Sequence, residues 1–183
     1  MLQTILSRTQ IVTIPRIEDE SLGAYLKKRK QIDVSNADSI VGRSDGDLLE
    51  AEEYIGDHLE QDENRDLFVQ LMRVCYKKGV LDMIQWAETI SATSKEHQKF
   101  FLKYALHMFR QSLLRNYTDN HLTKVSEEEE KFLLNFSKFI TGNNVIDLME
   151  KFNEAHYHIE RNANGKILFT NLCFQVMRFI HVS

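Results

Sequence analysis

SKEHQKFFLKYALHMFRQSLLRNY, which spans residues 94–117, is the stretch that decides the fold of this chain. Ser94 occupies the position of a helix N-cap, and neither proline nor glycine interrupts the residues that follow it. The spacing of the apolar side chains predicts one long helix that ends near Tyr117 and buries one face. These apolar residues are Phe100, Phe101, Tyr104, Leu106, Met108, Phe109, Leu113 and Leu114.

Helical patterns continue on both sides of this stretch. The chain contains one proline and seven glycines, and this scarcity of helix-breaking residues favours long helices over β-structure. Gly79 is expected to end one helix, and Ser126 with Glu129 has the form of a capping box at the start of another. From residue 65 onward the pattern predicts an all-α bundle of six helices, at about 66–78, 80–93, 94–117, 126–142, 144–162 and 166–181.

The first 64 residues are organised differently. The stretch TQIVTI, from Thr9 to Ile14, is rich in β-branched residues and stops at Pro15, which predicts one short strand. Three short helices are predicted after it, at about 18–29, 35–43 and 47–59, and they form a compact unit. The polar, acidic stretch at 60–64 is the predicted linker, so we place the domain boundary between residues 62 and 63.

The composition is that of a globular protein: 43% of the 183 residues are apolar and 27% are charged. The net charge of −4 gives no overall electrostatic case for binding nucleic acid. No apolar run reaches the ~18 residues of a membrane span, and no signal peptide is evident, so we expect a cytoplasmic location and no membrane partner. Cys75 and Cys173 lie in apolar helical patterns and are expected to be buried, reduced thiols.

We find no catalytic or metal-binding motif in the sequence, and we expect no cofactor. The patterns G-x-x-x-x-G-K-[ST], G-x-S-x-G, H-E-x-x-H and C-x-x-C are absent. His156 and His158 lie two positions apart on a predicted helix, so they point to different faces and do not suit one metal ion. The acids at 127–130 are interpreted as a solvated helix start. The basic run at 27–30 is interpreted as a solvated helix end, with a phosphate contact as the alternative.

The last predicted helix, at 166–181, is apolar on nearly all sides. A helix on the surface of a monomer needs only one apolar stripe. The extra apolar residues indicate either burial in the centre of the bundle or contact with another subunit, and the periodicity does not choose between these. The candidate interface residues are Ile167, Leu168, Phe169, Leu172, Phe174 and Met177.

Two short stretches resemble a known family. TILSRTQ at residues 4–10 closely resembles a motif that falls late in the nucleotide-binding domain of clamp-loader subunits, which are AAA+ proteins. ERNANGKILF at residues 160–169 resembles the turn into the last collar helix of bacterial DNA polymerase III delta-prime subunits, many of which have proline where this chain has Gly165. The two motifs lie at opposite ends of the chain, in the order that the family has.

This resemblance implies a C-terminal fragment whose nucleotide-binding core lies upstream of residue 1. Residues 1–16 would be the tail of that domain, residues 17–62 a three-helix lid, and residues 63–183 a helical collar that assembles into a pentameric loader. Arg8, within Ser7-Arg8-Thr9, would be an arginine finger that reaches the ATP of a neighbouring subunit. Leu49 falls where ATP-hydrolysing subunits carry a sensor arginine, which implies a subunit that does not hydrolyse ATP itself.

The partners implied by the resemblance are the ATPase motor subunits and the delta subunit of the loader. Primed DNA and the sliding clamp would be reached only through the assembled complex, which belongs to the DNA polymerase holoenzyme and acts in DNA replication. Two alternatives stay open. One is a motor subunit or a related AAA+ ATPase fragment, and the other is an unrelated helical adaptor whose match at residues 4–10 is due to chance.

Overall fold

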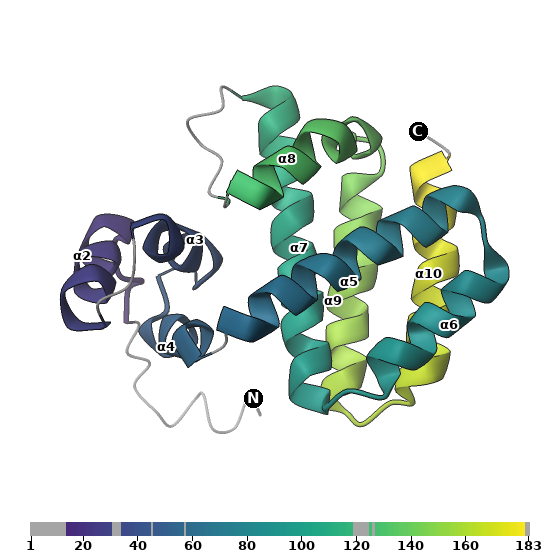
Figure 1. Ribbon diagram of the computed structural model, residues 1–183, viewed down its shortest axis with the longest axis horizontal. Helices are drawn as coiled ribbons and strands as arrows, with labels where there is room; N and C mark the ends of the chain where they lie inside the picture. Colours follow the sequence, from purple (N-terminus) through teal and green to yellow (C-terminus); the bar gives the residue numbers. More distant parts are fainter. Residues whose placement is uncertain are drawn as a thin grey trace, which may run out of the picture. The chain divides into compact units, whose positions relative to one another are not determined.

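The computed structural model describes residues 14–30, 34–44, 46–56, 58–118, 125 and 127–181. In these ranges every regular element is helical, with nine α-helices and one 3-10 helix, which confirms the predicted all-α fold (Figure 1). The strand predicted at Thr9–Ile14 lies outside the described residues except for Ile14, which is not in a strand. The chain divides into two compact units, Met1–Glu52 and Glu53–Ser183.

The first unit is built from three short helices: α2 (Asp19–Lys30), α3 (Val34–Ser44) and the first part of α4 (Leu48–Gly56). Asp47 caps α4, because its side-chain oxygen accepts hydrogen bonds from the backbone N–H groups of the second and third helical residues, at 2.9 and 3.2 Å. The small core consists of the buried residues Leu22, Leu26, Ala37, Ile40, Val41 and Ala51.

A single glycine fixes the turn that precedes α4. Gly46 has a φ of +80°, a left-handed conformation that side chains with a Cβ rarely adopt. A Cβ at this position would lie 2.6 Å from the carbonyl oxygen of Ile17. The close approach exists because the Gly46 carbonyl accepts a 3.0 Å hydrogen bond from the Ile17 N–H, which ties the turn to the chain before α2.

The predicted linker at 60–64 is wrong, because these residues lie within α5 (His58–Lys77). The stretch contains no proline or glycine, and its Glu and Gln residues have good helix propensity, so its polar composition does not require a loop. Asn64 is in fact buried. The predicted boundary between residues 62 and 63 therefore falls inside a helix, whereas the two units divide between Glu52 and Glu53.

The second unit is a bundle of six helices arranged in two layers (Figure 1). Helices α7, α9 and α10 run side by side, and α5 and α6 cross them, with α5 against α7 and α10 and α6 against α10. Helix α8 and the 3-10 helix η2 close the end near the C-terminus of α7. The bounds are α6 Val80–Ser91, α7 Lys95–Tyr117, α8 Glu127–Phe136, η2 Ser137–Phe139, α9 Val145–Glu160 and α10 Gly165–His181.

Aromatic side chains form the centre of this bundle. Phe68 of α5 is fully buried and makes edge contacts with the rings of Tyr104, Phe109, Phe132 and Phe136, at centroid distances of 5.5 to 6.1 Å. A second cluster joins α6, α7 and α10 through Trp86, Phe101 and Phe169. Edge-to-face pairs of this kind add stability beyond the area they bury. The first cluster therefore holds α5, α7 and α8 together, and the second fixes α10 against α6 and α7.

Candidate functional site

Helix α10 has one buried face and one exposed face. The buried residues Phe169, Leu172, Cys173, Val176 and Ile180 recur at intervals of three and four, and they face α5, α6 and α9. Burial in the bundle therefore accounts for the apolar residues on this face of the helix. It does not account for Ile167, which is 70% exposed, or for Phe174, which is 36% exposed.

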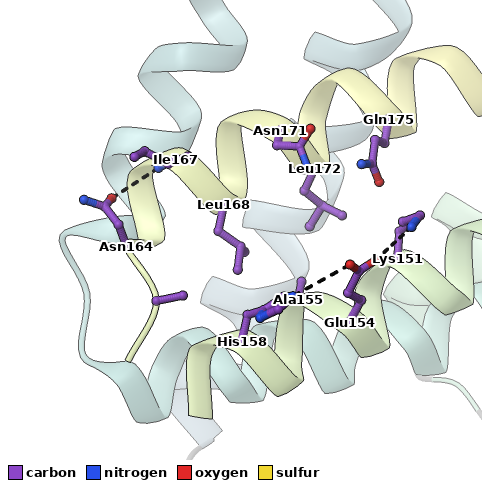
Figure 2. A pocket seen from close by; sticks show the side chains of 11 residues that line it. Lys151, Glu154, Ala155, His158, Asn164, Ile167, Leu168, Asn171, Leu172 and Gln175 are labelled. Carbon is purple, nitrogen blue, oxygen red and sulfur yellow. Dashed lines mark hydrogen bonds and ion pairs between the residues drawn. The ribbon is translucent and has the colours of Figure 1, made fainter. Parts of the chain in front are cut away.

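A groove of about 370 Å³ runs between α9 and α10 (Figure 2). We call it the α9/α10 groove. Its floor is apolar, because Leu168 and Leu172 point from α10 toward α9, where the small side chain of Ala155 leaves room between the helices. Polar side chains form both edges: Lys151, Glu154 and His158 on α9, and, on the other edge, Asn171 and Gln175 of α10 with Asn164 just before it.

The α9 edge of this groove carries three polar side chains that lie in a row, Lys151, Glu154 and His158. Lys151 Nζ lies 2.8 Å from Glu154 Oε2, and His158 Nε2 lies 3.7 Å from Glu154 Oε1. The hydrogen bond from Lys151 lowers the pKa of Glu154, and the same bond raises the pKa of Lys151. Both groups are exposed to solvent, so the pair adds little to stability and serves mainly to hold the rim in place.

The entrance to the groove is fixed by the turn that joins α9 to α10. Asn162 takes a left-handed conformation, with φ +61°, and ends α9. The N–H of Ala163 then bonds the carbonyl of His158 at 3.0 Å, the long bond of a Schellman turn. Asn164 caps α10, since its Oδ1 accepts a 3.2 Å hydrogen bond from the Ile167 N–H (Figure 2).

A second hollow lies on the same helix, and we call it the basic hollow. It is lined by Phe174 and Met177 together with Lys78, Arg178 and His181, and it shares Asn171 and Gln175 with the α9/α10 groove. The two hollows therefore form one continuous surface along the exposed face of α10. We call this the α10 surface. Its carboxamides and apolar side chains suit recognition of another protein surface.

The six residues predicted as an interface take different positions. Ile167 and Phe174 are exposed on the α10 surface, and Leu168 and Met177 are partly buried and line the two hollows. Leu172 is 3% exposed and forms part of the groove floor. Phe169 is fully buried against Trp86 and Phe101, so it is a core residue that offers no accessible surface.

The remaining candidate residues lie elsewhere. Ser7, Arg8 and Thr9 are outside the described residues. Leu49 is exposed near the start of α4, and its N–H bonds the capping carboxylate of Asp47. Cys75 and Cys173 are reduced and fully buried, as predicted. The hydrogen bond with the Cys173 thiol, followed by burial, raises the pKa of Cys75.

One acid at the start of α8 was misinterpreted from sequence. Glu129 is buried, and the Tyr104 hydroxyl donates a 2.9 Å hydrogen bond to its Oε1. It is therefore a link between α7 and α8, whereas Glu128 and Glu130 are exposed as expected of a helix start.

Sequence reasoning also missed the polar edges of the α9/α10 groove. A seven-residue spacing that joins Asn164, Asn171 and Arg178 on one side of the last helix was the available signal.

Within the described ranges, no three His, Cys, Asp or Glu side chains are grouped so as to hold a metal ion. In that same part of the chain, no helix has the length and apolar content needed to cross a bilayer. The comparisons with known proteins found no match among family models, curated proteins or solved structures.

Proposed function

We propose that this chain is a non-catalytic assembly subunit of a clamp-loader-type complex, similar to the delta-prime subunit of bacterial DNA polymerase III. In this proposal the second unit joins neighbouring subunits through the α10 surface, and Arg8 reaches the ATP held by one of those neighbours. The observation that carries the assembly role is the pair of large apolar side chains, Ile167 and Phe174, that the bundle leaves exposed on α10.

The physical argument rests on two side chains. Ile167 and Phe174 lie two helical turns apart and therefore on the same face of α10. Both are large and apolar, and Ile167 is 70% exposed. Complete burial of an exposed side chain of this kind contributes roughly 1.5–3 kcal/mol, and Phe174, which is only 36% exposed, contributes correspondingly less than Ile167. A helix of a neighbouring subunit, laid along the α9/α10 groove, would cover Ile167 and contact the apolar floor beneath it.

The organisation of the chain supports the clamp-loader assignment. The resemblance implies a small lid followed by a larger collar, and the chain divides into a small helical unit and a six-helix bundle. An unrelated single-bundle adaptor would not require this division. Leu49 supports a subunit that does not hydrolyse ATP, because an aliphatic side chain forms no hydrogen bond or ion pair with a phosphate group.

The assembly role is tested with the motor subunits of a clamp loader from the same source. We expect the chain to co-migrate with them in size-exclusion chromatography with light scattering, and we expect Ile167→Asp to abolish co-migration. Ile146→Asp is the matched control, because Ile146 of α9 is also 70% exposed but lies outside the α10 surface. Equal assembly by both variants would contradict the role of α10.

The finger role is tested separately in the same complex. Arg8→Ala should leave assembly intact and lower ATP turnover by about 10³-fold or more, since a finger arginine stabilises charge on the transferred phosphoryl group. Unchanged ATP turnover in a complex that assembles normally would contradict the finger role and favour the helical-adaptor alternative. The two measurements therefore distinguish the clamp-loader function from assembly alone.

A further inference from the structure

A third hollow lies on a different part of the second unit, where α5, α8, η2 and the end of α10 meet. We call it the aromatic groove, and its volume is about 320 Å³. Its floor is formed by the buried side chains of Met72, Phe136 and Ile180. The space suits one or two apolar side chains of a ligand. None of these residues belongs to the α10 surface, so the groove is a separate feature of the molecule.

The walls of the aromatic groove are held in place before any ligand binds. The ring of Tyr76 is stacked on the imidazole of His181 at 5.7 Å and lies 5.1 Å from the ring of Phe139. On the other wall Phe132 is stacked on Phe136 at 4.9 Å. His181 is itself fixed, because its Nδ1 lies 2.8 Å from the carbonyl oxygen of Met177. A site with fixed walls loses little conformational entropy on binding.

Two cations border this apolar space. Arg73 and Lys138 line the groove and are exposed, and neither forms an ion pair with any other described residue. The lining that the structure describes contains no Asp or Glu. Lys138 lies in the last turn of η2, where attraction to the helix C-terminus accounts for a cation, whereas Arg73 lies before the last turn of α5 and is not explained in this way.

The positive charge extends beyond the groove. The basic hollow lies beside the groove, because the ring of His181, which is stacked on Tyr76, lines that hollow. The cations of the basic hollow are Lys78 and Arg178, and no acidic side chain lines it among the described residues. The chain as a whole has a net charge of −4, so the local positive charge at this end of the bundle is opposite in sign to the net charge. Local charge of one sign around a cleft attracts a ligand of the opposite sign.

We propose that the aromatic groove binds a short acidic peptide segment of a partner protein. A large apolar side chain of the peptide fills the groove, and neighbouring carboxylates pair with Arg73 and Lys138. This site does not depend on the α10 surface or on the clamp-loader assignment. A nucleic-acid base fits less well, because its polar edge would face Met72 and Ile180 and lose its hydrogen bonds to water.

Fluorescence anisotropy with defined probes tests the proposal at low salt. The main probe is fluorescein-labelled Gly-Asp-Glu-Leu-Phe-Glu-Asp-Gly. One control peptide replaces Leu-Phe by Ser-Ser, a second replaces the four acids by their amides, and a third probe is a thymidine oligonucleotide of 16 nucleotides. We expect saturable binding of the main probe, on the order of 10–100 µM, and at least tenfold weaker binding of every control.

Charge-reversal variants locate the site. Arg73→Glu and Lys138→Glu should each weaken binding of the main probe about five- to tenfold, because each removes one attraction and adds a repulsion. Arg110→Glu, at an exposed arginine of α7 outside the groove, should leave binding unchanged. No saturable binding by the main probe at 1 mM would overturn the proposal. Equal binding of the amide peptide, tighter binding of the oligonucleotide, or equal effects of all three variants would also overturn it.

Discussion

Phe68→Ala is the substitution that most directly tests the packing of the second unit. The Phe68 ring is fully buried and sits between four other aromatic rings, from α7 and α8. Truncation of a buried phenylalanine costs about 3–5 kcal/mol, because the cavity that remains is not filled by relaxation. Because Phe68→Ala also removes four edge contacts between rings, we expect a cost at the upper end of this range, with the free energy of unfolding lowered by about 4–5 kcal/mol.

Phe174→Ala is the matched control, because it removes the same atoms from a side chain that is 36% exposed. We expect it to cost less than about 1.5 kcal/mol, and to weaken assembly instead. Urea unfolding followed by fluorescence reports on the second unit alone, since the chain has a single tryptophan, Trp86, buried in that unit. With a slope of about 2 kcal/mol per molar, Phe68→Ala should lower the midpoint by about 2 M. Midpoints for the two variants within 0.3 M of each other would refute this reasoning.

Three further predictions concern buried side chains. Asn144→Ala should lower the free energy of unfolding by about 2–3 kcal/mol in the same urea assay. The Asn144 side-chain amide donates hydrogen bonds to the carbonyls of Phe139 and Phe179, and its oxygen accepts one from the Thr141 N–H. A decrease of less than 0.5 kcal/mol would contradict this prediction. Cys75 and Cys173 should not react with Ellman's reagent in the folded protein, and both should react in 8 M urea. The raised pKa of Cys75 makes the free energy of unfolding depend on pH. The stabilisation is complete below about pH 8.5 and is lost as the pH rises further, because the thiol ionises first in the unfolded chain. A stability that increases between pH 8.5 and 10 would contradict this.

The helices could be predicted because local signals and burial agree along most of the chain. Ser94 accepts a 3.1 Å hydrogen bond from the His97 N–H, and the helix after it ends at Tyr117, as its apolar spacing predicts. The end of α5 shows where a local rule was incomplete. Gly79 was expected to end that helix, yet Lys78 takes the left-handed conformation, with φ +56°, and Gly79 is the N-cap of α6.

The features that could not be predicted depend on contacts between distant residues. The burial of Glu129 depends on Tyr104, a residue of another helix, and no local pattern at 127–130 reveals it. The split of the last helix into a core face and an exposed face depends on which neighbours cover it. Periodicity identified its apolar residues correctly, but Phe169 and Ile167 differ only in whether α6 and α7 lie against them. The aromatic groove likewise joins α5 to η2, which are far apart in the sequence.

The most direct measurement of the central claim compares the reactivity of Ile167→Cys and Ile146→Cys toward a maleimide, before and after mixing with clamp-loader motor subunits. The native thiols are fully buried, so they stay silent, and both introduced thiols replace isoleucines that are 70% exposed. We expect equal rates in the isolated chain and, in the complex, slowing by at least tenfold at position 167 alone. Unchanged labelling at position 167 in a complex that has formed would contradict assembly through the α10 surface.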